Sequence, residues 1–293
     1  MRNPTLTVLF VIAVTILVGG YLIYQWCMPK RLVVSTTTSL YATGLLDAIA
    51  DGFKAHNPNV EVVFVAVGSG EALRRAAQGD ADLVLVHAPS LELTYIQKGV
   101  ISKSRIFAYN YFLIVGPKDD PARIEGLDPV EAFKAIFKAG EEGEIEFISR
   151  GDNSGTHVRE LALWRRAHLD PKGEPWYIET GSGMAETLRV ANEKRAYTLT
   201  DVGTYLKLKE TLGELKPLVK GGRLLLNIYS GYLVVSSKEP ELAMRFLEYL
   251  VSDEVQVLIK NFGVEEYGGQ LFYPVNSTSL AELKKAWAEL AEV

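Results

Sequence analysis

Four short segments rich in serine, threonine and glycine each lie where a strand-like run ends and a helix-like run begins. The first turn of a helix exposes unpaired N–H groups and the positive end of the helix dipole, and glycine lets a ligand approach the backbone. Serine and threonine add O–H donors, so each segment has the chemistry of an anion-binding turn. The segments are STTTS at 35–39, GSG at 68–70, RGDNSGT at 150–156 and TGSGM at 180–184.

Taken singly, each segment is also explained as an ordinary helix N-cap, because the same residue types are favoured there for local reasons. Their recurrence at equivalent strand ends favours a shared anion pocket, since an open α/β sheet gathers its ligands at the carboxyl ends of its strands. Arg150 would add a fixed charge and a forked set of donors for a tetrahedral oxyanion. The alternative for Arg150 is a salt bridge to Asp152 or to the protein surface.

The same residues do not form a catalytic or metal motif. Neither GSG segment is a G-x-S-x-G nucleophile elbow, and no P-loop pattern occurs. We expect His157, which follows the SGT turn, to be a surface histidine on a helix. With one cysteine and four scattered histidines the chain offers no site for a bare metal ion, and we predict no cofactor and no enzymatic activity.

Composition indicates a globular chain with room for one large domain or two ordinary ones. The 293 residues are 48% hydrophobic and 23% charged, and the formal net charge is −5. Because the chain lacks the basic balance of a nucleic-acid-binding protein, we expect no nucleic-acid partner.

The N-terminal part, residues 1–28, has the character of a membrane segment. Residues 5–26 form a run of 22 residues without a charge, which as a helix would be about 33 Å long, enough to cross a bilayer core. An uncleaved anchor is favoured, because bulky residues follow Gly19 and Gly20 where a signal-peptide cleavage site would need small ones. A cleaved signal and lipidation at Cys27 remain open.

From residue 31 onward strand-like and helix-like runs alternate, which is typical of an α/β fold with mainly parallel sheets. Strands are expected at 31–36, 60–67, 83–86 and 145–149. A helix is expected to open within the GSG turn at 68–70 and to run through residue 78. Further helices are expected at 43–56, 91–98, 129–139, 154–168, 184–194, 202–212, 239–252, 253–261 and 281–290.

Two long apolar runs, 107–115 and 224–236, bracket the middle of the chain. Each could carry the chain between two bodies, which predicts a discontinuous first lobe, 31–112 with 226–293, and an inserted second lobe, 113–225. The alternative is that both runs are central strands of a single sheet.

Several segments together resemble the TupA-type tungstate-binding proteins, the solute receptors of tungstate ABC importers. They are VVSTTTSLYATGLL, VGSGEALRRAAQGDADLVLVHAP, YNYFLIVGPKDDPA, FISRGDNSGTH, GSGMAETLRVANEKRAYTLTD and YPVN. The resemblance covers about residues 32–275 in the family's order. It implies a type II periplasmic-binding-protein fold with the oxyanion in a cleft between lobes. It also implies ABC permease subunits as partners and an extracytoplasmic body on its anchor at the cell membrane.

The resemblance also assigns the expected ligand residues. Donors from the first lobe would be Thr38, Ser39 and Ser69, and those from the second lobe Arg150, Ser154, Gly155, Thr156, Gly183 and Met184. The chain departs from the family at Val202, where an arginine usually follows the LTD aspartate, so it has one positive charge fewer.

Asp152 leaves the identity of the anion open. Phosphate-binding proteins carry a similar R-x-D-x-S-G-T pattern whose aspartate accepts the proton of hydrogen phosphate, whereas tungstate at neutral pH has no proton to give. Phosphate is therefore the alternative ligand, and molybdate is not distinguished from tungstate. Two other classes are an enzyme on the same scaffold, which would need a reactive cysteine or base in the cleft, and a sensor ectodomain, which would need a cytoplasmic domain.

Overall fold

The computed structural model describes residues 14–17, 19 and 29–292. The expected anchor, residues 1–28 with Cys27, lies almost entirely outside the described residues. Among the residues that are described, no helix is long and apolar enough to cross a membrane.

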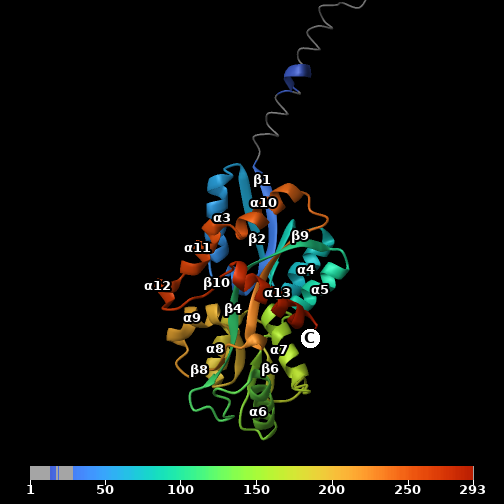
Figure 1. Cartoon of the computed structure of the whole chain (residues 1–293). Helices are drawn as coiled ribbons and strands as arrows, with labels where there is room; N and C mark the ends of the chain where they lie inside the picture. The colour runs from blue at the N-terminus through green and yellow to red at the C-terminus, as the bar shows by residue number, and fades with distance from the viewer. Residues whose placement is uncertain (1–13, 18, 20–28, 293) are drawn as a thin grey trace, which may run out of the picture.

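Two groups of buried apolar side chains divide the fold. The first group consists of three clusters from residues 32–108 and 226–290, and we call this part the first lobe. The other group comes from residues 112–225, the second lobe. In Figure 1 the first lobe lies above the second, and strands β4 and β9 run between them.

The first lobe is built on a six-strand path in the order β10-β4-β9-β3-β1-β2. The pairs β1–β2 and β1–β3 are parallel, whereas β3–β9, β4–β9 and β4–β10 are antiparallel. Its strands are β1 (Lys30–Thr37), β2 (Val60–Val67), β3 (Leu83–Val86), β4 (Ile101–Pro117), β9 (Leu226–Val234) and β10 (Tyr273–Pro274). Its helices are α2 (Thr38–Tyr41), α3 (Leu45–His56), α4 (Ser69–Gln78), α5 (Pro89–Gln97), α10 (Pro240–Leu250), α11 (Asp253–Asn261), α12 (Val264–Tyr267) and α13 (Ser277–Ala291).

The second lobe contains the C-terminal part of β4, residues 112–117. Strands β7 and β8 both pair antiparallel with this part of β4, and β5 pairs parallel with β6. Its strands are β5 (Phe147–Ser149), β6 (Tyr177–Glu179), β7 (Thr198–Asp201) and β8 (Leu215–Lys220). Its helices are α6 (Pro129–Glu141), α7 (Gly155–Arg166), α8 (Met184–Lys194) and α9 (Val202–Leu208), with short 3-10 turns η1 (Lys209–Thr211) and η2 (Arg223–Leu225).

Strand β4 combines the two interpretations of the long apolar runs. Its residues up to Tyr111 pair with β9, and from Phe112 onward it pairs with β7 and β8. The strand therefore crosses between the lobes and is also a central strand in the sheet of each. The second run crosses as β9, which begins directly after Leu225 of the second-lobe core.

The expectation of mainly parallel sheets is wrong, because most strand pairings are antiparallel. The physical reason is that β4 and β9 carry the chain in opposite directions and lie side by side. Three strands of the second lobe, β6, β7 and β8, fall outside the strand ranges expected from the sequence. The first two are only 3 and 4 residues long, and Pro217 in β8 is a residue that argues against a strand.

Candidate functional site

The starts of four helices converge on the turn between β5 and α7, residues 150–156. Arg150 of this turn donates from Nη2 to Thr38 Oγ1 at the start of α2, at 3.5 Å. Its Nε donates to Ser182 O, just before α8, at 3.3 Å. The backbone N–H of Gly70 in the first turn of α4 donates to Asn153 O at 3.3 Å. Four segments singled out in the sequence therefore meet at one place between the two lobes.

We call the place where these four segments meet the junction, and Arg150 supplies its positive charge. Its side chain is only 2% exposed, and Nη2 lies 2.5 Å from Asp152 Oδ2. Asp152 also accepts, through Oδ1, from the N–H of Ser154 at 3.1 Å. The turn folds back in this way because Gly151 and Asn153 adopt left-handed backbone angles, with φ of 61° and 55°. The carboxylate of Asp152 is thus held between the guanidinium and the start of α7.

Three hydroxyls in the junction are buried without a hydrogen-bond partner among the described residues. They are Ser39 Oγ, Ser69 Oγ and Thr156 Oγ1, on residues 6%, 0% and 1% exposed. A buried polar group left without a partner costs about 1–3 kcal/mol. Three such groups at one junction therefore fit a ligand that accepts hydrogen bonds.

Two of the helix starts lack a side-chain cap. Gly68, the N-cap of α4, and Gly183, the N-cap of α8, have extended backbones and make no capping hydrogen bond within the described part of the chain. The N–H groups of these first turns are therefore available to an anion, apart from that of Gly70.

The remaining predicted residues differ in which of their polar groups are still free to donate. Ser154 is the N-cap of α7 and accepts from the N–H of His157 through Oγ, so its O–H hydrogen can still be donated. Gly155 begins α7. The side chain of Met184 packs in the core of the second lobe, which leaves its backbone N–H as the only polar donor.

The expectation that His157 is a surface histidine is wrong. His157 is 9% exposed, and its Nδ1 accepts from the N–H of Asn153 at 3.0 Å. Burial lowers its pKa from the ordinary value. This hydrogen bond stabilises the left-handed backbone conformation of Asn153.

A buried carboxyl group that the sequence analysis missed supports the Arg150 turn. Glu160 of α7 accepts from Ser149 Oγ at 2.8 Å, Tyr177 OH at 2.5 Å and Trp164 Nε1 at 3.3 Å. Ser149 Oγ in turn accepts from the N–H of Gly151. Burial raises the pKa of Glu160 to about 7.

Val202, the departure from the family pattern, brings no charge to the junction. It is the first residue of α9 and packs beside the second-lobe core. The preceding Asp201 caps α9 by accepting from the N–H and hydroxyl of Thr204. Burial raises the pKa of Asp201, and the charge of Arg150 opposes that rise.

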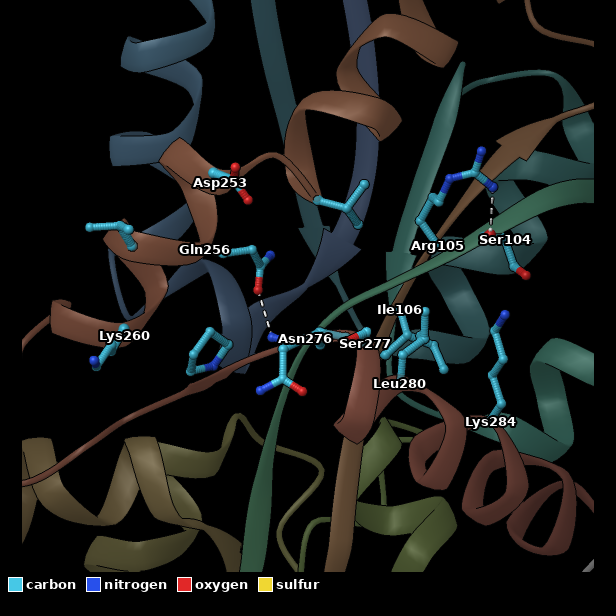
Figure 2. Close-up of a pocket in the computed structure, with 14 residues that line it drawn as sticks. Ser104, Arg105, Ile106, Asp253, Gln256, Lys260, Asn276, Ser277, Leu280 and Lys284 are labelled. Atoms are coloured by element: carbon cyan, nitrogen blue, oxygen red, sulfur yellow. Dashed lines mark hydrogen bonds between the residues drawn. The ribbon is translucent and has the colours of Figure 1, made fainter.

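A large cavity lies away from this junction, on the first lobe. Its volume is about 810 Å³. Figure 2 shows it between α11, β4 and the start of α13. The residues that line it include the apolar Ile106, Val257 and Leu280 and the charged Lys260 and Lys284. None of the predicted ligand residues lines it.

Comparisons with known proteins agree on one relationship. A family model described as a PBP superfamily domain matches residues 28–254. The chain is 38% identical over 247 residues to the tungstate-binding protein TupA of Peptoclostridium acidaminophilum, covering 83% of this chain and 85% of that protein. The solved structure of the tungstate-binding protein TupA from Desulfovibrio alaskensis G20 is 37% identical with a TM-score of 0.71, over 85% of this chain and 100% of that one. A tungstate ABC transporter structure from Geobacter sulfurreducens is 40% identical with a TM-score of 0.69, over 80% of this chain and 100% of that one.

Proposed function

The chain belongs to the PBP superfamily and, within it, to the TupA-type tungstate-binding proteins, and from this premise we propose that it captures tungstate between its lobes for an ABC importer. Molybdate, which has nearly the same size and charge, is the second anion the site would accept.

The observation that carries the proposal is the set of unpartnered hydroxyls beside a buried guanidinium. Ser39, Ser69 and Thr156 each hold a buried donor without a partner among the described residues. Tungstate is a dianion without a proton, so it can accept from every one of them. One arginine together with helix N-termini can stabilise such an anion without a full counter-charge.

Each lobe contributes part of the proposed ligand set. The first lobe offers Thr38, Ser39 and Ser69. The second lobe offers Arg150, the backbone and hydroxyls of Ser154, Gly155 and Thr156, and the backbone N–H groups of Gly183 and Met184. The anion would first dock on one lobe, and bending of β4 and β9 would then bring in the donors of the other.

Phosphate is the alternative ligand because a carboxylate lies at the junction. Asp152 is in contact with Arg150, where it could accept the proton of hydrogen phosphate. The same carboxylate would repel an anion that has no proton. The two ligands are therefore distinguished by their protonation, and a titration separates them.

The proposed function is tested by titrating the purified protein with tungstate, molybdate, sulfate and phosphate in a calorimeter. We expect tungstate to bind more tightly than sulfate and phosphate. Elemental analysis of the protein as purified would name an anion carried through purification. If no oxyanion binds better than about 1 mM, a free energy near 4 kcal/mol, the receptor function is wrong.

Substitution of the guanidinium tests the site itself. Arg150→Ala should weaken tungstate binding by about 3 kcal/mol, more than a hundredfold, because it removes a charged donor and leaves Asp152 unpaired. Arg166→Ala, at the exposed end of α7, is the matched control and should bind as the wild type does. Equal affinities of the two variants would remove Arg150 from the site.

Two further parts of the proposal concern the whole chain. The division into 31–112 with 226–293 and 113–225 is proposed as the pair of rigid bodies that move on closure, and the grouping of buried side chains supports it. Residues 1–28 are proposed to anchor an extracytoplasmic body to the cell membrane, beside the permease subunits. The uncharged run at 5–26 supports this.

A further inference from the structure

His87 follows β3 in the first lobe and is tied to both crossing strands. Its Nδ1 lies 2.8 Å from Asn227 Oδ1 on β9. Asn227 donates from Nδ2 to Asn110 Oδ1 on β4 at 2.8 Å, and these two asparagines are opposite each other in the strand pairing. Beyond Asn110, β4 enters the second lobe, where Phe112 pairs with Asp201. The network thus lies where the chain passes between the lobes.

The hydrogen bonds determine which ring nitrogen of His87 carries the proton. Both hydrogens of the Asn227 amide are used, toward Asn110 Oδ1 and the hydroxyl of Tyr229. Its Oδ1 must therefore accept, and His87 Nδ1 must donate. The other nitrogen, Nε2, is buried and has no partner among the described residues.

The imidazole of His87 also touches the second lobe. A Cβ atom added to Gly155, the first residue of α7, would lie 2.6 to 2.8 Å from three ring atoms. His87 and Gly155 share a cavity of only about 10 Å³ with Arg159 and neighbouring residues of both lobes, roughly the space for one water molecule. The ring therefore lies between the two lobes, against the first residue of α7. We assign the N–H groups at the start of this helix to the anion.

We propose that His87 is a positioning residue for anion capture: it is linked to the crossing strands through Asn227 and sets the place of the α7 N-terminus through contact with Gly155. This inference rests on the proposed function. Because the ring belongs to the first lobe and Gly155 to the second, the contact forms on closure and is lost on opening. His87 thereby links bending of β4 and β9 to assembly of the donor set, without touching the anion.

The surroundings keep the ring neutral, as this role requires. Burial lowers the pKa of the ring and the hydrogen bond to Asn227 raises it, whereas Arg150 and Arg159 of the second lobe lower it and Asp152 raises it. The remaining neighbours are uncharged, namely the rings of Phe112 and Tyr229 and the amide of Asn227. Burial is the largest effect and lowers the pKa of His87 to about 4.

A double-mutant cycle tests the contact, with sodium tungstate as the probe. Gly155→Ala should weaken binding by about a hundredfold, because its Cβ meets the ring. In a His87→Ala background the same change should weaken binding by less than about tenfold, because the ring is gone. If Gly155→Ala lowers the tungstate affinity by the same factor with and without the His87 ring, the inference is wrong.

Two further variants separate the ring contact from the hydrogen bond and guard against a simple loss of folding. His87→Asn keeps an N–H that can reach Asn227 but removes the ring, and His87→Phe keeps a ring but removes the donor. Each should bind tungstate more weakly than the wild type. Each should also show a smaller decrease in radius of gyration on saturation, measured by X-ray scattering. Wild-type affinity and compaction in both variants, with melting as cooperative as that of the wild type, would overturn the inference.

The wild-type titration separates this inference from the proposed function. If the wild type fails to bind tungstate but binds phosphate, the ligand assignment is wrong, and the cycle is carried out with phosphate. If the wild type binds and compacts but the cycle is additive, only the role of His87 is wrong. If the wild type binds none of the four oxyanions, the proposed function and the inference fail together.

Discussion

Asp152 places a carboxylate beside the guanidinium that the proposed anion needs. Its two oxygens are occupied by Arg150 and by the N–H of Ser154. An anion without protons gains from the guanidinium and loses through repulsion by the carboxylate. For hydrogen phosphate the carboxylate is instead a hydrogen-bond acceptor. The residue therefore decides between the two candidate ligands through the protonation of the anion.

Asp152→Asn should strengthen tungstate binding by about tenfold, the effect of removing roughly 1.4 kcal/mol of repulsion. The asparagine oxygen can still accept from the N–H of Ser154, so the start of α7 should stay in place. Phosphate binding, if present, should weaken. Calorimetric titration of both anions measures the change, and Asp170→Asn, at an exposed position in the second lobe, is the control. Weaker tungstate binding in Asp152→Asn would show that orienting Arg150 matters more than repulsion.

At this scale the meeting of the hydroxyl- and glycine-rich segments was predictable, whereas the residues that support them were not. Their role as ligands stays a prediction. Ser39, Ser69 and Arg150 are recognisable because their types suit an anion and they follow expected strands. His87 also follows a buried strand, but a single histidine there gives no signal until Gly155 is found against it. Glu160 looks like any polar residue of a helix until its burial is known.

Helix α7 joins the Arg150 turn to the second-lobe core through Glu160. Its carboxyl group is buried and hydrogen-bonded to Ser149, Tyr177 and Trp164. The pKa of Glu160 rises from 4.5 to about 7, chiefly because burial penalises the charged form. The folded protein therefore keeps a proton that the unfolded chain loses between these pH values. Stability attributable to this group is full below pH 4.5 and falls as the pH rises through 7.

Glu160→Gln should remove this pH dependence. The pKa difference corresponds to about 3 kcal/mol, so the free energy of unfolding of the wild type should fall relative to the variant by most of that amount between pH 5 and pH 8. Urea denaturation at the two pH values measures it. Glu144→Gln, an exposed position, should follow the wild type. A parallel pH dependence in Glu160→Gln and the wild type would show that the buried carboxyl is not the cause.

Among the elements, helices were easier to anticipate than second-lobe strands. Helix α4 was expected to open within the turn 68–70 and to run through residue 78, and it spans Ser69–Gln78 with Gly68 and Gly79 as its caps. Strand β7 has 4 residues and β6 has 3, too few for a pattern to develop. Their place is fixed by pairing with β4 and β5, and that pairing joins residues distant in the sequence.

The net charge of the molecule opposes its proposed ligand. Residues 1–27 carry only Arg2, so the remaining chain has a formal charge of −6. A negative body does not attract an anion from a distance, so capture depends on donors within a few ångströms. The proposed closure would favour such capture, because exclusion of water strengthens each hydrogen bond to the anion. The overall charge therefore does not indicate an anionic ligand, whereas the segments of serine, threonine and glycine predict one.

The same negative body makes the N-terminal segment the only proposed attachment to the membrane. An acidic surface does not bind anionic lipid, so retention must come from the uncharged run at 5–26. The full chain should stay in the membrane pellet after washing with high salt and alkaline carbonate, and detergent should release it. A chain starting at Lys30, where β1 begins, should remain in solution and bind tungstate as the full chain does. Intact mass measurement of the membrane fraction distinguishes the alternatives. An unchanged N-terminus supports the anchor, a mass starting at a lipid-modified Cys27 means a lipoprotein, and a soluble shortened chain means a cleaved signal.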